Sequence, residues 1–108
     1  MDPSAIVVLI TAPNSEVGKQ IAKTLVEQKL AACVNIINSI ESIYAWEGKI
    51  YDESEVLLVV KTRLDLFEQE LVPAVKALHP YEVPEIIALP IQMGSKSYLD
   101  WIIKETFK

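Results

Sequence analysis

The hydrophobic positions of this 108-residue chain follow a period that changes along the sequence, and these changes predict alternating strands and helices. Residues 5–11 are apolar almost throughout, which is typical of a strand buried on both faces. Residues 16–28 carry apolar side chains at every fourth position, as in an amphipathic helix, and Asn14 or Ser15 can cap its first turn. The stripe of this helix consists of Val17, Ile21 and Leu25.

The middle of the chain is rich in residues that favour extended structure. Residues 30–37 predict a second strand, and residues 40–46 predict a further extended segment. The Glu-Gly-Lys sequence at 47–49 is a turn signal, and residues 55–62 predict a third core strand after it. These segments together predict a β-ribbon that protrudes from the sheet.

The last part of the chain predicts two helices separated by a short strand. Apolar residues in 64–78 recur at steps of three and four, which predicts an amphipathic helix, and Pro73 predicts a kink or break inside it. Residues 85–89 lie between two prolines and predict a fourth strand with few pairing partners. Ser97 can cap a final helix.

The order of these elements predicts an α+β fold in a single domain over residues 1–108. It corresponds to a ferredoxin-like split βαβ sandwich with an extended β-ribbon and an extra C-terminal helix. Such a sheet packs its helices on one face. Because the strands are apolar at nearly every position, the other face needs a partner, and the pattern predicts self-association.

Composition and charge exclude several classes of protein. Hydrophobic residues make up 51% of the chain, yet no apolar run approaches the roughly 20 residues of a membrane span. The net charge of −5 argues against a nucleic-acid partner, which requires a basic surface. The N-terminus lacks the features of a signal peptide, and a single cysteine fits a reducing compartment, so a cytoplasmic location is expected.

Five segments, in this order and with short gaps, resemble the CutA family of divalent-cation tolerance proteins. They are KLAACVNI at 29–36, SIYAWEGKI at 42–50, KT at 61–62, HPYEVPEIIALP at 79–90 and YLDW at 98–101. The resemblance implies a ferredoxin-like homotrimer that supports tolerance of copper and other divalent metals in the bacterial cytoplasm. It implies no required cofactor beyond a possible divalent metal such as Cu²⁺, and no enzymatic activity is expected.

The chain departs from the copper-site pattern of some family members at two positions. Ile10 stands where those members carry a cysteine just before Thr-Ala-Pro. Leu78 stands where they carry the first of two histidines before Pro-Tyr. Two of the soft ligands suspected in those members are therefore absent here.

Three residues are candidate metal ligands, and each has a structural alternative. Cys33 could bind a soft metal as a thiolate, or it could be a small core residue on a strand. His79 could bind a metal, or it could bond the last carbonyl groups of its helix. Glu85 would add an oxygen ligand. One chain offers too few nitrogen and sulfur ligands for a closed site, so a metal site depends on assembly.

A second set of residues could line a ligand cleft between subunits. The aromatic members could equally serve interface packing, and the charged ones could be solvated ends of strands. Tyr98 and Trp101 near the C-terminus could join the aromatic members. The cleft candidates are Tyr44, Trp46, Glu55, Lys61, Tyr81 and Glu82.

These residues leave several functions open. The leading hypothesis is a homotrimeric divalent-cation tolerance protein with weak copper binding, whose partners are copies of itself and divalent metal ions. The alternative is a trimeric small-molecule sensor, similar to PII signalling proteins, without an intrinsic metal site. A small enzyme or a purely structural trimer would also fit, although no motif for nucleotide binding or hydrolysis is present.

Overall fold

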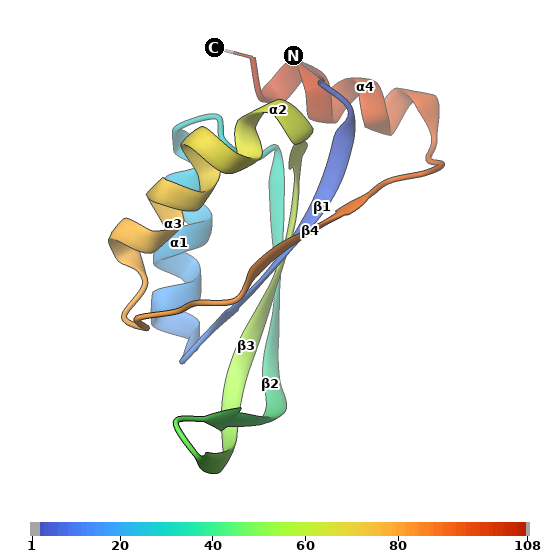
Figure 1. Cartoon of the computed structure of the whole chain (residues 1–108). Helices are drawn as coiled ribbons and strands as arrows, with labels where there is room; N and C mark the ends of the chain where they lie inside the picture. The colour runs from blue at the N-terminus through green and yellow to red at the C-terminus, as the bar shows by residue number, and fades with distance from the viewer. Residues whose placement is uncertain (1–2, 108) are drawn as a thin grey trace.

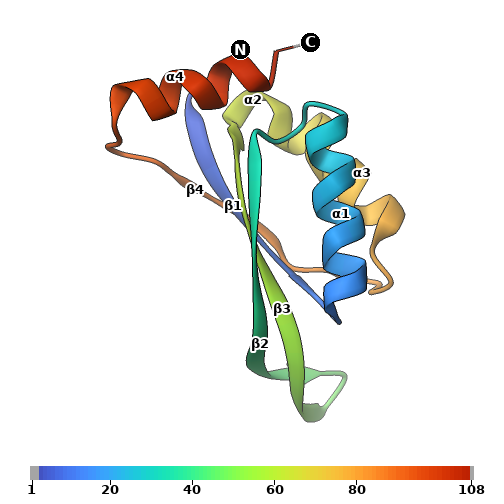
Figure 2. The ribbon, with the colours of Figure 1, turned by 180° about the vertical axis from the view of Figure 1, so that it is seen from behind.

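The computed structural model describes residues 3–107 as an α+β fold (Figure 1). The strands stand in the order β2-β3-β1-β4, and all neighbouring strands are antiparallel. Figure 1 and Figure 2 show α1 and the segment from α2 to α3 on one side of the sheet, with α4 across one end. The elements are β1 (Ala5–Ala12), α1 (Ser15–Glu27), β2 (Cys33–Trp46), β3 (Lys49–Arg63), α2 (Leu64–Leu66), η1 (Phe67–Leu71), α3 (Val72–Leu78), β4 (Ile86–Pro90) and α4 (Lys96–Glu105).

The hydrophobic core lies between the sheet and the helices α1, η1 and α3. Burial alternates along β1, so that every second side chain points into this core. The Asn14 side chain accepts a hydrogen bond from the Val17 N–H at 2.9 Å, which confirms Asn14 as the cap of α1. The core residues of the sheet and helices include Ile6, Val8, Ile10, Ile21, Leu25, Val56, Leu58, Val60, Leu71 and Val75.

The opposite face of the sheet is apolar but only partly covered within one chain. Val7 and Leu9 of β1 alternate with the buried positions and are half-buried. Because paired residues of antiparallel strands project to the same face, their neighbours on β2, β3 and β4 share this face. The expected burial of β1 on both faces is therefore wrong for the isolated chain. The open face contains Val7, Leu9, Ile37, Leu57, Val59, Ile87 and Leu89.

The strands β2 and β3 continue as a two-stranded ribbon beyond β1, which ends opposite Val56 (Figure 1). The predicted turn is confirmed: Glu47 and Gly48 have φ values of +49° and +80°, the conformation that tight hairpins require. The two extended segments predicted at 30–37 and 40–46 are one strand, interrupted by a register shift between Ile37 and Ile40.

The kink predicted at Pro73 takes the form of a π-helical turn, η1, immediately before the proline. The N–H of Val72 donates to the carbonyl of Phe67, five residues back. Pro73 then occupies the first turn of α3, where a missing N–H leaves no hydrogen bond broken. None of the described helices is long and apolar enough to cross a membrane.

Several predicted boundaries are wrong. The third strand was expected at residues 55–62, but β3 begins at Lys49, directly after the turn. The second strand begins at Cys33, not at residue 30, because the N–H groups of Leu30 and Ala31 both donate to the Leu25 carbonyl and close the end of α1. Strand β4 begins at Ile86, after Glu85. Ser95, and not Ser97, precedes the first residue of α4, and it makes no capping hydrogen bond through its side chain.

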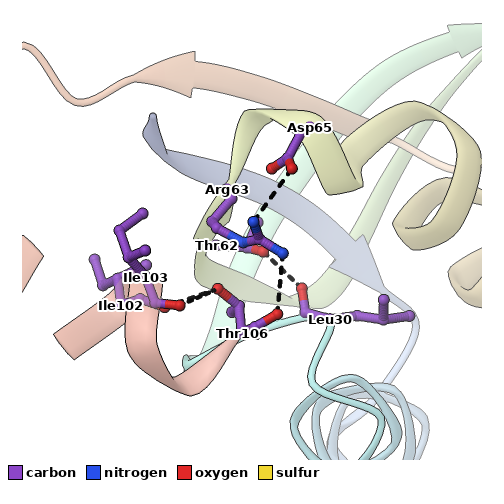
Figure 3. Close-up of polar contacts among 7 residues, drawn as sticks. All are labelled: Leu30, Thr62, Arg63, Asp65, Ile102, Ile103 and Thr106. Atoms are coloured by element: carbon purple, nitrogen blue, oxygen red, sulfur yellow. Dashed lines mark hydrogen bonds and ion pairs between the residues drawn. The ribbon is translucent and has the colours of Figure 1, made fainter. Parts of the chain in front are cut away.

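The end of α4 is anchored to β3 by a buried arginine (Figure 3). The guanidinium of Arg63 pairs with Asp65 at 3.2 Å and donates to the carbonyl of Thr106 at 3.1 Å. It also lies 4.1 Å from the ring centre of Phe107. On the other face, the hydroxyl of Thr62 donates to the Leu30 carbonyl at 2.7 Å. The Arg63 contacts join the end of the last helix to β3, and the Thr62 contact joins the segment after α1 to the same strand.

Candidate functional site

A cleft of about 750 Å³ lies at the base of the ribbon, between one ribbon face and the loop that follows α3. Tyr44 pairs with Tyr51 and Ser42 pairs with Glu53 across the two strands, so these side chains share one face. The cleft is lined by Thr11, Glu41, Ser42, Ile43, Tyr44, Trp46, Tyr51, Glu53, Glu55, Tyr81, Glu82, Val83 and Glu85.

Aromatic rings form part of the cleft wall. The rings of Tyr44 and Tyr51 stack with their centres 5.3 Å apart. The hydroxyl of Tyr44 donates to Oε1 of Glu53. This hydrogen bond, with partial desolvation and the negative charge of Glu53, raises the pKa of Tyr44 to about 12. Tyr44 is therefore a neutral phenol at physiological pH.

Glu55 is a buried carboxylate in the cleft wall, with 5% of its surface exposed. Its Oε2 atom accepts a hydrogen bond from the hydroxyl of Tyr81 at 2.8 Å. Burial, and then this hydrogen bond to a negative group, raise the pKa of Tyr81. Glu55 itself forms no ion pair with a Lys, Arg or His side chain within residues 3–107.

His79 positions the loop that carries Tyr81. Its Nε2 atom lies 2.7 Å from the carbonyl of Thr11, and its Nδ1 atom accepts the N–H of Tyr81 at 3.2 Å. The neutral tautomer with its proton on Nε2 satisfies both contacts. The side chain is 8% exposed and thus fastens the loop to the end of β1, instead of bonding the last carbonyls of its own helix.

Cys33 and Lys61 lie outside this cleft. They are paired near the opposite end of the β2–β3 ladder, where the Lys61 ammonium donates to Oδ1 of Asn35. The Cys33 Sγ atom lies 3.9 Å from the same oxygen. Tyr98 of α4 lies near the Cys33 thiol, and burial together with this thiol raises the pKa of Tyr98. These residues form a separate polar cluster on the open sheet face.

The candidate metal ligands are not brought together within one chain. Two of these candidates lie at different levels of β3. His79 contacts Thr11, which pairs with Leu57 of β3. Cys33 pairs with Lys61, four residues further along the same strand. Glu85 and Glu82 line the cleft as exposed carboxylates. Among the described residues, no group of three or more His, Cys, Asp or Glu side chains is placed to hold a metal ion.

The cleft contains residues that sequence reasoning did not select, above all Tyr51 and Glu53. The predicted hairpin could have identified both residues from sequence. Once residues 47–49 form a tight turn, antiparallel pairing places Tyr51 opposite Tyr44, and alternation places Glu53 and Glu55 on the same face. Tyr98 and Trp101 instead contact each other on α4, with ring centres 5.5 Å apart, and do not line the cleft.

Comparison with known sequences gives matches over nearly the whole chain. The model of the family described as "CutA1 divalent ion tolerance protein" matches residues 6–105. The chain is 55% identical over 100 residues to "Divalent-cation tolerance protein CutA" of Thermus thermophilus, covering 93% of this chain and 96% of that protein. It is 54% identical over 102 residues to "Protein CutA, chloroplastic" of Arabidopsis thaliana, covering 94% of this chain but 56% of that protein.

Solved structures match equally well. The structure of the Thermus thermophilus "Divalent cation tolerance protein (Cut A1)" has a TM-score of 0.92 at 53% identity, covering 95% of this chain and 99% of that one. The "Periplasmic divalent cation tolerance protein CutA" of Archaeoglobus fulgidus has a TM-score of 0.91 at 46% identity, covering 95% and 99%. One relative is thus named chloroplastic and another periplasmic, and the cytoplasmic location expected for this chain stays a prediction.

Proposed function

This chain belongs to the CutA1 divalent ion tolerance family, and on that basis we propose that it acts in the response to divalent metal ions, copper among them. The observation that carries the proposal is the match over residues 6–105, supported by a relative that is matched over 96% of its length. No enzymatic activity is part of the proposal.

The proposed working form is a homotrimer of ferredoxin-like subunits. The open sheet face supports self-association, because Val7 and Leu9 lie beside apolar neighbours that the chain's own helices leave partly uncovered. Exposed apolar patches of this kind mark protein–protein interfaces. Assembly would also let ligands from different copies meet, which one chain does not achieve.

The proposed metal binding is weak and centred on the cleft. Glu82 and Glu85 present exposed carboxylates there, which suit divalent cations. His79 contributes a nitrogen ligand only if it gives up its contact with Thr11 or with Tyr81. Cys33 contributes only if another copy brings it to the cleft. Both conditions lower the affinity, in keeping with weak binding.

Calorimetric titration of the metal-free protein with Cu²⁺ tests this proposal. We expect saturable weak binding that falls at least threefold in the double variant Glu82→Gln/Glu85→Gln. The variant Glu27→Gln changes one exposed carboxylate at the end of α1, outside the cleft, and serves as the control. Binding that is absent, or equal in all variants, would contradict a copper site in the cleft.

The role of His79 needs its own variant. If it is a ligand, His79→Ala weakens Cu²⁺ binding beyond the effect of the carboxylate variants. Unchanged binding in His79→Ala would remove it from the ligand set and leave it as the residue that holds the loop. A saturable small-molecule ligand without any Cu²⁺ binding would instead support the sensor alternative.

A further inference from the structure

The Glu55 carboxylate is the feature of the cleft that calls for a ligand. It is 5% exposed and lines the cleft, and Tyr81 satisfies only its Oε2 atom. Within the described part of the chain, its charge has no cationic partner, and Oε1 has no hydrogen-bond donor. Oε1 is not among the fully buried atoms that lack a hydrogen-bond partner, so this oxygen is accessible from the cleft and can pair with a cation that arrives from solvent.

The walls around Glu55 are aromatic, which favours an organic cation. Tyr44 and Tyr51 form a stacked pair that lines the same cleft, and Tyr81 contacts the carboxylate itself. The hydroxyl protons of Tyr44 and Tyr81 are both directed at carboxylates, so these rings are neutral phenols with available π faces. Ammonium groups and the methylene groups beside them bind well to such faces.

The carboxylates of the cleft are spread out. Glu53, Glu55, Glu82 and Glu85 all line it, yet no three acidic side chains among residues 3–107 converge on one point. A compact divalent cation requires several oxygen ligands within about 2.0–2.6 Å. Separate carboxylates along an aromatic cleft better match a chain that carries separate positive charges. The cleft volume of about 750 Å³ is adequate for such a molecule.

We propose that this cleft binds a linear aliphatic polyamine. One ammonium group pairs with Glu55 and its neighbour Glu53, the methylene chain lies along the rings of Tyr44 and Tyr51, and a second ammonium group reaches the exposed carboxylates of the loop. This ligand class goes beyond metal tolerance. The proposed site shares Glu82 and Glu85 with the proposed copper site but is centred on Glu55, which is no part of the copper proposal.

Calorimetric titration of the full chain with spermidine, in a metal-free buffer at about 0.15 M salt, tests the proposal. We expect saturable binding that weakens about tenfold or more in Glu55→Gln, because one charge-assisted contact is lost. Glu27→Gln carries the same change in charge outside the cleft and is expected to bind within twofold of the unchanged protein. Tyr44→Leu removes a π face and is expected to weaken binding several-fold.

Several results would overturn the proposal. They are the absence of saturable spermidine binding, equal weakening in Glu27→Gln and Glu55→Gln, or displacement of spermidine by the same concentration of Mg²⁺, which carries charge without methylene groups.

Glutamine preserves the acceptor for the Tyr81 hydroxyl, and circular dichroism verifies that Glu55→Gln folds. If it does not fold, Glu53→Gln, at an exposed position, provides the same comparison. The Cu²⁺ titration is separate, so either proposal can fail alone.

Discussion

Hydrogen bonding at single residues decides the chemistry of the cleft. His79 is the only histidine of the chain, and within the structure both of its ring nitrogens contact the backbone, at Thr11 and Tyr81. The contact with Tyr81 orients the hydroxyl that bonds Glu55. The residue selected as a metal ligand thus organises the cleft around a carboxylate, and its ligand role stays a prediction.

Several single residues of the cleft could be predicted, and alternation along the strands explains those on the ribbon. Tyr44, Trp46, Glu55, Tyr81 and Glu82 were selected from sequence and do line it. Lys61 was also selected, but it lies six residues beyond Glu55 on the same strand, about 20 Å away at about 3.3 Å per residue. Alternation in the sequence places the side chains of Glu55 and Lys61 on one face of the strand. The cleft lies near Glu55 because β1 ends there, opposite Val56, and the sequence pattern does not show where β1 ends relative to this strand.

Tyr44 gives a pH-dependent prediction at this scale. Its pKa of about 12 in the folded protein exceeds the value of about 10 for an unperturbed tyrosine. The hydrogen bond to Glu53 therefore stabilises the fold fully below about pH 10, and this contribution is lost as pH rises through about 12. Ultraviolet titration of the chain against Tyr44→Phe should show a phenol ionising near pH 12, which Glu53→Gln lowers. If the phenol that is missing in Tyr44→Phe ionises near pH 10, the contact with Glu53 would be contradicted.

At the scale of elements, periodicity predicted the type and order of the strands and main helices, while their ends depended on hydrogen bonds that the pattern does not encode. The backbone at Leu30 and Ala31 closes α1 through the Leu25 carbonyl, although these apolar residues resemble the start of a strand. Pro73 correctly predicted a distortion of the helix. Its form, a π-helical turn over Phe67–Leu71 on the N-terminal side of the proline, could not be predicted from the pattern.

The anchoring of α4 gives a prediction about stability. Arg63→Ala would leave the carboxylate of Asp65 buried without its partner, because both side chains are less than 10% exposed. We expect it to lower the free energy of unfolding by about 3–5 kcal/mol. Lys96→Ala breaks the exposed pair with Asp100 and is expected to cost far less, because water screens this pair. Denaturant unfolding at one fixed protein concentration compares them, and equal losses would argue against the anchor.

At the scale of the whole molecule, the two faces of the sheet differ in how they are covered. Helices bury one face, whereas the face that contains Leu9 and Val59 stays partly open although it is equally apolar. The continuous apolar strands seen in the sequence predict burial on both faces, and the chain itself covers only the helix-packed face; the proposed self-association would cover the other.

Light scattering tests this assembly. The unchanged chain should have a mass near three times the 12.1 kDa of one copy. Leu9→Glu places a charge on the open face and should shift the mass toward one copy, because burial of an unpaired carboxylate is costly. Gln20→Glu adds the same charge at an exposed position of α1 and should leave the mass unchanged. A single-copy mass for the unchanged chain, or a full trimer in Leu9→Glu, would contradict the interface.

X-ray diffraction from crystals soaked with Cu²⁺, with the anomalous signal of copper recorded, tests the proposed function most directly. The expected result is a copper peak inside the cleft of each copy, beside the carboxylates of Glu82 and Glu85, with three copies closing their open sheet faces on one another. Copper found only at scattered surface positions, with the clefts open to solvent and empty, would contradict the proposal.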